Sequence, residues 1–117
     1  MMSNLEPPIY DRTEALARLD GDTSLFSEMA GIFVAENDAY CRALEDALAA
    51  GDAPALRREA HTVKSLFATF SYEAGRELAM RLEHLAATGS LDGAEVLTKE
   101  VVAAVKRLGE AFAGEAT

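Results

Sequence analysis

Apolar residues recur at the spacing of an α-helix through most of the chain, and this feature constrains the fold more than any other. In the clearest stretch the intervals are four, three, four and three residues, through Leu56, Ala60, Val63, Phe67 and Phe70. Side chains at this spacing share one face of a helix. Alanine and leucine, both strong helix formers, supply most of the apolar residues, and the β-branched runs typical of strands are nearly absent. The sequence therefore predicts an all-helical protein.

Short segments rich in glycine and aspartate interrupt the helical pattern and predict where the helices end. Gly51 is expected to end a long helix, Asp52 to cap the next one, and Ser71 to cap the one after that. We expect a short helix followed by four long ones, at residues 11–19, 23–50, 52 to about 70, 71 to about 88, and 91 or 93 to about 112.

Four long amphipathic helices with short connections predict an antiparallel, up-down-up-down four-helix bundle, with the short N-terminal helix capping one end. We expect this bundle to occupy residues 10–113, between a flexible N-terminal arm at 1–9 and a C-terminal tail at 114–117. A chain of 117 residues is long enough to form one such domain without disulfides or structural metals.

The chain is strongly acidic, which excludes several classes of partner. It has 20 Asp and Glu against 11 Lys and Arg, a net charge of −9, so binding to nucleic acid or to an anionic membrane surface is not expected. The one cysteine, Cys41, cannot form an intramolecular disulfide, which fits a reducing compartment. No stretch approaches the ~20 apolar residues of a membrane helix. We therefore expect a cytoplasmic protein that is monomeric.

The helix that follows Asp52 carries an exposed histidine among basic residues. At 100° per residue, His61 points roughly 140° away from the centre of the apolar stripe. Five residues lie within roughly 60° of it on the same side: Arg57, Arg58, Lys64, Ser65 and Ala68. The segment between Leu19 and Cys41, by contrast, contains no cation. The sequence thus concentrates positive charge around one solvent-facing imidazole.

This arrangement suits nucleophilic chemistry toward a phosphoryl group. A neutral imidazole is a good nucleophile, and neighbouring cations oppose its protonation. The same cations would stabilise an incoming phosphoryl group, and the ammonium of Lys64, one turn from His61, can reach a phosphoryl oxygen. The small side chains of Ser65 and Ala68 leave room for another protein's active site. Because glycine-rich phosphate loops and zinc-ligand spacings are absent, we expect no ATP site, no metal and no cofactor on this chain.

The run Ala60-His61-Thr62-Val63-Lys64-Ser65, followed by a helix that contains Leu82-Glu83, resembles the histidine-containing phosphotransfer (HPt) domain of two-component phosphorelays. The resemblance implies that His61 accepts a phosphoryl group from the aspartyl phosphate of a receiver domain and passes it to another receiver. Its partners would then be a hybrid histidine kinase and a response regulator, and the magnesium would belong to the receiver. Lys64 would assist by charge, and four residues are expected to face the docked partner: Arg57, Arg58, Ser65 and Ala68.

Several positions depart from the HPt pattern, although none removes a group that the chemistry needs. Ser65 stands where glycine is usual, and Leu66 and Phe67 follow where small residues are usual. Tyr72 would project onto the His61 side if the helix continued that far. The second histidine, His84, has no comparable neighbours and is expected to lie on the surface or at the rim of the bundle.

Two other functions remain open on the sequence alone. The chain could be a helical adaptor that binds and regulates a receiver or kinase without being phosphorylated. It could also be the phosphate-accepting segment of a chemotaxis-type kinase. Loss of phosphate flow with retained binding in a His61→Gln variant distinguishes a carrier from an adaptor.

Overall fold

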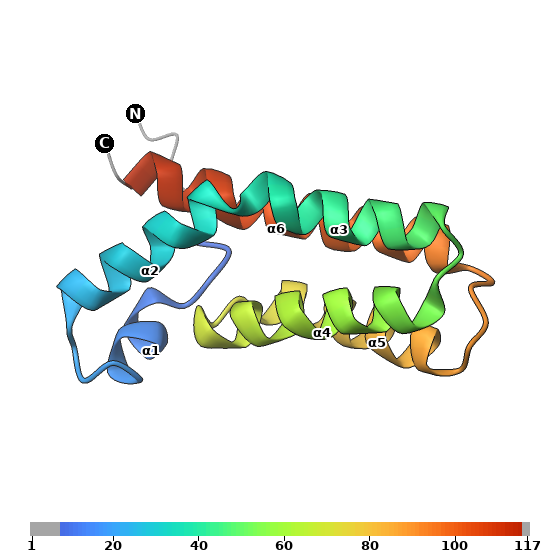
Figure 1. Cartoon of the computed structure of the whole chain (residues 1–117). Coiled ribbons are helices and arrows are strands. Elements are labelled where there is room, and N and C mark those ends of the chain that lie inside the picture. Colours follow the sequence, from blue (N-terminus) through green and yellow to red (C-terminus); the bar gives the residue numbers. More distant parts are fainter. Residues whose placement is uncertain (1–7, 116–117) are drawn as a thin grey trace, which may run out of the picture.

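The computed structural model of the protein describes residues 8–115, and in this part of the chain every regular element is an α-helix (Figure 1). This confirms the predicted all-helical fold. The helices are α1 (Arg12–Ala17), α2 (Thr23–Ala35), α3 (Asn37–Ala49), α4 (Ala53–Thr69), α5 (Glu73–Ala87) and α6 (Ala94–Glu115).

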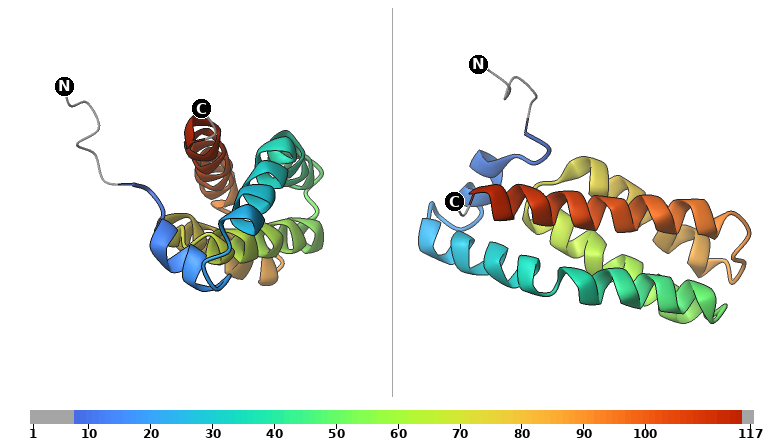
Figure 2. Two further views of the ribbon diagram at one scale, coloured as in Figure 1. Left: turned by 90° about the vertical axis from the view of Figure 1, so that its left-hand side faces the viewer. Right: turned by 90° about the horizontal axis from the view of Figure 1, so that it is seen from above.

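The long helices form a bundle in which α3 lies beside α6 and α4 lies beside α5 (Figure 1). Contacts between α3 and α4 and between α5 and α6 close the ring, so α4 and α6 are diagonal to one another. The view from above shows α6 running alongside α2 and α3, with α1 at the end of the bundle where α2 begins (Figure 2). The short helix therefore caps one end, as predicted.

The prediction of one long helix at 23–50 is wrong in one respect, because the helix is interrupted at Glu36. The backbone there leaves helical geometry, with φ −93° and ψ 4°, and α2 and α3 meet at an angle (Figure 1). The side-chain amide of the next residue, Asn37, donates a hydrogen bond to the carbonyl oxygen of Val105 on α6, at 2.9 Å. Gly109 makes room for it, since a Cβ at that position would lie 2.5 Å from Asn37 Nδ2. The break is thus associated with a contact to a distant helix.

Aspartate side chains cap three of the helices at their N-termini. Asp11, Asp22 and Asp52 accept hydrogen bonds from backbone N–H groups three residues ahead, at 2.9, 3.0 and 3.0 Å. Such caps satisfy backbone donors that have no partner within the helix. The cap at Asp52 confirms the predicted start of the helix that carries His61, and Gly51 before it has the left-handed φ of 64° expected at a helix end.

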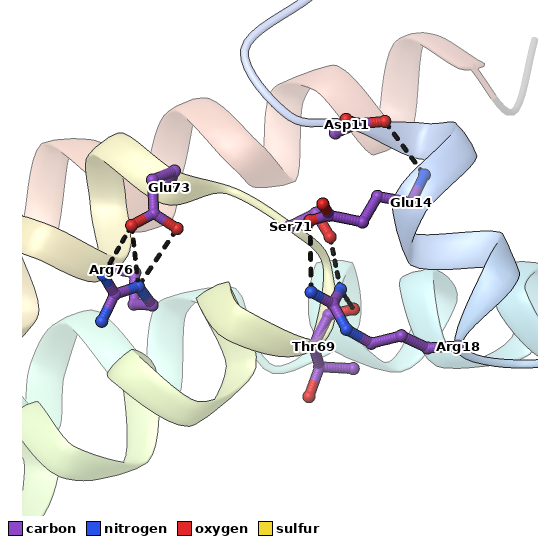
Figure 3. A network of polar contacts seen from close by, with 7 residues as sticks. All are labelled: Asp11, Glu14, Arg18, Thr69, Ser71, Glu73 and Arg76. Carbon is purple, nitrogen blue, oxygen red and sulfur yellow. Dashed lines mark hydrogen bonds and ion pairs between the residues drawn. The ribbon is translucent and has the colours of Figure 1, made fainter.

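Ser71 was predicted to cap the following helix, and this prediction is wrong. Ser71 instead follows the end of α4 with a left-handed φ of 56°. Its carbonyl accepts a hydrogen bond from Asp11 N at 3.0 Å, and its hydroxyl accepts one from the guanidinium of Arg18 (Figure 3). Arg18 is also paired with Glu14, at 3.2 Å. These contacts tie α1 to the turn between α4 and α5. The N-cap position of α5 is Tyr72, one residue later, and it makes no side-chain cap hydrogen bond.

Tyr72 does not lie on the His61 side of α4, because that helix ends at Thr69. Its side chain is buried, and its ring centroid lies 5.0 Å from that of Phe67. The close approach of α5 requires glycine, since a Cβ at Gly75 would lie 2.8 Å from the Tyr72 ring. The helix thus does not continue far enough for Tyr72 to project onto the His61 side.

The core contains the predicted apolar stripe of α4 and a cluster of aromatic rings near α1. Every stripe residue is buried: Leu56, Ala60, Val63, Phe67 and Phe70. Ring contacts join five residues of the cluster: Tyr10, Phe26, Phe33, Phe70 and Phe112. Cys41 is also buried, as expected for a packing residue, and loss of hydration raises the pKa of its thiol. No helix among the described residues is long and apolar enough to span a membrane.

Side-chain contacts join the N-terminal segment of the domain to the C-terminal end of α6. Most of the predicted flexible arm, at 1–7, lies outside the described residues, but Ile9 packs against the core. The hydroxyl of the buried Tyr10 lies 2.6 Å from Glu115 Oε2, and Arg12 pairs with the same carboxylate at 3.2 Å. The helix α6 continues to Glu115, two residues beyond the predicted end of the bundle at 113, where this contact is made.

Replacement of Tyr10 by phenylalanine is expected to lower the free energy of unfolding by about 1–2 kcal/mol, because it removes a hydrogen bond to a charged group. Urea unfolding would measure the change. Tyr40→Phe is the matched control, since the Tyr40 hydroxyl has no hydrogen bond to the described residues. Burial, and then Glu115, raises the pKa of Tyr10 to about 12. The contribution should therefore persist at neutral pH and be lost as the pH rises toward 12. Equal losses in the two variants would contradict the prediction.

Candidate functional site

His61 lies near the middle of α4, on the side of the helix that faces away from the core. Its side chain is 59% exposed, while Ala60 and Val63 beside it are buried. The structure places the other predicted residues of this face as follows: Arg57, Arg58 and Ser65 are exposed, and Lys64 and Ala68 are half-buried. A straight helix with one apolar stripe thus presents the imidazole to solvent.

A carboxylate from the neighbouring helix connects His61 and Lys64. Glu83 on α5 places Oε2 2.7 Å from His61 Nδ1 and Oε1 2.6 Å from Lys64 Nζ. The Glu83 side chain is only 13% exposed, whereas its partners His61 and Lys64 are 59% and 26% exposed, so the carboxylate lies beneath a site that is open to solvent on the His61 side. The packing of α4 against α5 therefore brings together three side chains that are up to 22 residues apart.

The electrostatics of this trio favour an ionised Glu83. Contact with Lys64, and then with His61, lowers the pKa of the Glu83 carboxyl below its ordinary value of 4.5. A depressed folded-state pKa means that the contact stabilises the fold above pH 4.5, and that this stabilisation is lost as the pH falls through the folded-state value. At neutral pH Glu83 is thus a fixed hydrogen-bond acceptor.

The contact with Glu83 assigns the tautomer of the imidazole. An ionised carboxylate can only accept hydrogen bonds, so Nδ1 of His61 carries the proton that points to Oε2. In the neutral ring, the lone pair is then on Nε2, the nitrogen that does not contact Glu83. A carboxylate–histidine contact of this kind also fixes the ring orientation. The arrangement yields an oriented imidazole whose second nitrogen lies on an exposed helix surface.

Glu83 belongs to the sequence motif, but the sequence alone did not predict its role at the site. The pattern around His61 indicates cations alone, whereas the structure adds a carboxylate in direct contact with the ring. Lys64 is paired with that carboxylate, and Arg57 and Arg58 form no ion pair with the described residues. The Leu82-Glu83 pair was the available signal, but its orientation toward His61 depends on how α4 and α5 pack.

A groove of about 540 Å³ extends from His61 toward the start of α4 and the end of α5. Its charged walls come from Arg57, Arg58 and Glu83, and its remaining walls include the small residues Ala53 and Gly89. The groove is open to solvent and is therefore suited to contact with another macromolecule more than to enclosure of a small substrate.

The remaining candidates lie away from this site or form no site. His84 is exposed on α5, as expected for a surface residue. Among residues 8–115 there is no group of three or more His, Cys, Asp and Glu side chains that could hold a metal ion.

Fold and site together define a class of protein: a helical bundle that presents one oriented, accessible imidazole at its surface. The sequence model of the Hpt domain matches residues 28–112. The chain belongs to the Hpt domain family, whose members serve histidine phosphotransfer in two-component phosphorelays.

One solved structure shows how closely the fold agrees. The crystal structure of histidine-containing phosphotransfer protein B from Pseudomonas aeruginosa PAO1 superimposes with a TM-score of 0.83 at 24% sequence identity, over 94% of this chain and 96% of that one. No curated protein matched the sequence. Hpt domain proteins are phosphoryl carriers, not kinases, and they interact with receiver domains of response regulators and with kinases.

Proposed function

We propose that His61 accepts a phosphoryl group from the aspartyl phosphate of one receiver domain and passes it to the receiver domain of a response regulator. One observation carries the proposal: the exposed imidazole is held through Nδ1 by Glu83, at 2.7 Å, with Nε2 free to react. The Hpt domain match over residues 28–112 supports the same chemistry.

The transfer step follows from this tautomer. The Nε2 lone pair attacks phosphorus, a nitrogen–phosphorus bond forms, and the acyl-phosphate oxygen–phosphorus bond breaks, with its electron pair leaving on the aspartate. The ring then carries a positive charge, and its Nδ1 proton remains against the Glu83 carboxylate. In the reverse step the aspartate carboxylate of the second receiver attacks phosphorus, and the nitrogen–phosphorus bond breaks with its electron pair returning to Nε2. The ring is then again a neutral imidazole with its proton on Nδ1. No proton has to be moved in either direction.

Lys64 supplies a positive charge for the phosphoryl oxygens in this proposal. Its ammonium lies against Glu83 Oε1, at 2.6 Å, one turn along α4 from His61. The flexible lysine stem lets the ammonium move toward a phosphoryl group on Nε2 while the carboxylate continues to hold Nδ1. Glu83 would thus hold both groups ready in the unphosphorylated protein.

The receiver would dock over the exposed face of α4. Arg57, Arg58, Ser65 and Ala68 surround His61 on this face. Beyond them, Ile32 on α2 is 57% exposed and lines a small apolar hollow together with Leu66. Magnesium and the remaining transfer machinery are assigned to the receiver, and phosphorylation from ATP alone is not expected.

Phosphotransfer from a panel of receiver domains tests the proposal. Each receiver would be charged with a small phosphodonor and mixed with the full chain, and ATP alone would be a parallel sample. We expect acid-labile, base-stable phosphate that maps to the peptide containing His61. Absence of label from every receiver, with binding retained, would replace the carrier by a non-phosphorylated adaptor.

Replacement of Glu83 by glutamine is expected to slow phosphoryl transfer about tenfold to a hundredfold, because the amide no longer fixes the proton on Nδ1. Receiver affinity should change little, since Glu83 is largely buried. Single-turnover transfer rates and the ¹⁵N chemical shifts of the imidazole would measure the two effects. Glu77→Gln is the matched control on α5, because Glu77 pairs with the exposed Arg81, at 3.7 Å, and with no other cation in the part of the chain that the structure describes. Equal rates in both variants would show that Glu83 does not position the nucleophile.

A further inference from the structure

The groove beside His61 combines two basic side chains with small, uncharged walls. Arg57 and Arg58 are exposed, line the groove and pair with no carboxylate among the described residues. Four other arginines each contact a glutamate: Arg12, Arg18, Arg76 and Arg81. Arg42 and Arg107 also form no ion pair with the described residues, but neither lines the groove beside His61. Guanidinium groups left free at the rim of a reactive site are available to a partner.

The charge in this groove is not cancelled by the acid that lies nearest to it. Glu83 is already held by Lys64 and His61. Glu59, which lies between Arg58 and Ala60 in the sequence, does not line the groove. The groove is therefore a local basic surface on a chain whose net charge is −9.

The other side of His61 is chemically different. Toward the end of α4, Ser65 and Ala68 carry no charge, and the neighbouring α2 has a single charged residue, Glu28. Exposed apolar side chains on that helix include Ile32. The surface around the imidazole is thus polarised along α4, from two unpaired guanidinium groups at the groove to side chains without charge near α2. The one arginine that contacts the end of α4, Arg18, is paired with Glu14.

Resting on the function proposed above, we propose that the groove receives acidic side chains of the partner receiver and that this contact sets the receiver's orientation and selectivity. The fitting receiver has two carboxylates on one side of its phosphorylated aspartate and an apolar surface on the other. Guanidinium groups bind carboxylates in paired hydrogen bonds. A receiver docked in the reverse sense would place its carboxylates over the uncharged end of the face and leave both arginines unpaired.

The basic groove also affects the partner before the two proteins are in contact. A strongly acidic chain repels an acidic partner at long range, and a basic groove at the reactive histidine directs such a partner to that point. Receivers without the matching carboxylates gain nothing from the groove and are disfavoured relative to those that have them.

A double variant, Arg57→Glu with Arg58→Glu, tests the proposal against a receiver that charges the wild-type chain. We expect the Kd to rise about tenfold or more at low salt, mainly through slower association, and the dependence of affinity on salt to weaken. The matched control is Lys99→Glu with Lys106→Glu on α6, diagonal to α4, which changes the net charge equally. That control should alter the Kd less than about threefold. Circular dichroism would confirm that both variants are folded.

A charge exchange completes the test. Acidic residues around the receiver's phosphorylated aspartate would be changed singly to arginine, and one of them should restore binding to the double variant. If the wild-type chain accepts phosphate but the double variant and the control bind alike, the groove proposal alone fails. If no receiver transfers phosphate to the wild-type chain, the proposed function fails, and the groove proposal with it.

Discussion

His61→Gln is expected to abolish phosphoryl acceptance and to leave the fold and receiver binding intact. Glutamine has no nucleophilic nitrogen, but its amide can still donate a hydrogen bond to Glu83 and keep the carboxylate paired with Lys64. Because the His61 side chain is 59% exposed, its replacement should change the free energy of unfolding by only about 0.5 kcal/mol. Phosphotransfer and receiver binding, measured on the same preparations, would show the separation.

The second histidine provides the matched control for this experiment. His84 is exposed on α5, adjacent in sequence to Glu83, and no carboxylate among residues 8–115 contacts its ring. His84→Gln should therefore accept phosphate at the wild-type rate. Residual label on His61→Gln, or loss of label on His84→Gln, would show that a residue other than His61 accepts the phosphoryl group. Parallel loss of binding and transfer in His61→Gln would mean that the imidazole is needed for docking.

Local patterns in the sequence predicted most of the helical framework. The stripe from Leu56 to Phe70 identified the buried face of α4 and, by geometry, the exposed position of His61. The cap at Asp52 identified the start of that helix. These features succeed because helix periodicity and capping depend on residues within a few positions of one another.

Features that depend on distant contacts could not be predicted in the same way. The break at Glu36 involves no glycine or proline, and it coincides with a hydrogen bond from Asn37 to a helix 68 residues away. Ser71 resembled a helix cap in sequence, but its hydroxyl is bonded to Arg18, 53 residues earlier. In both cases a polar side chain contacts a residue that is far away in the sequence.

The candidate site was predicted in part for the same reason. His61 and Lys64 lie on one helix, so their spacing alone places them on neighbouring turns. Glu83 joins them only because α5 packs against α4 with one particular rotation. Helix periodicity predicts which face of α5 is buried, but it does not specify which residue at the edge of that face meets the imidazole.

Phe112→Ala is expected to lower the free energy of unfolding by about 3–5 kcal/mol, the usual range for a buried phenylalanine. Its side chain is buried, and its ring centroid lies 4.8 Å from that of Phe70 and 5.1 Å from that of Tyr10. Phe26 and Phe33 contact the same ring, at 5.9 and 5.8 Å. Removal of the ring would leave a cavity where α1, α2, α4 and α6 meet.

Urea unfolding of the full chain would measure this loss, with Val96→Ala as the control on the same helix. Val96 is 67% exposed and should contribute little. Because domains of this size have a total stability of about 5–15 kcal/mol, the Phe112→Ala variant would be studied at low temperature, where a larger fraction is folded. A loss below about 1 kcal/mol would show that the neighbouring rings close the cavity. Since His61 does not contact the ring cluster, the folded fraction should still accept phosphate, which separates the stability of the bundle from the chemistry of its surface.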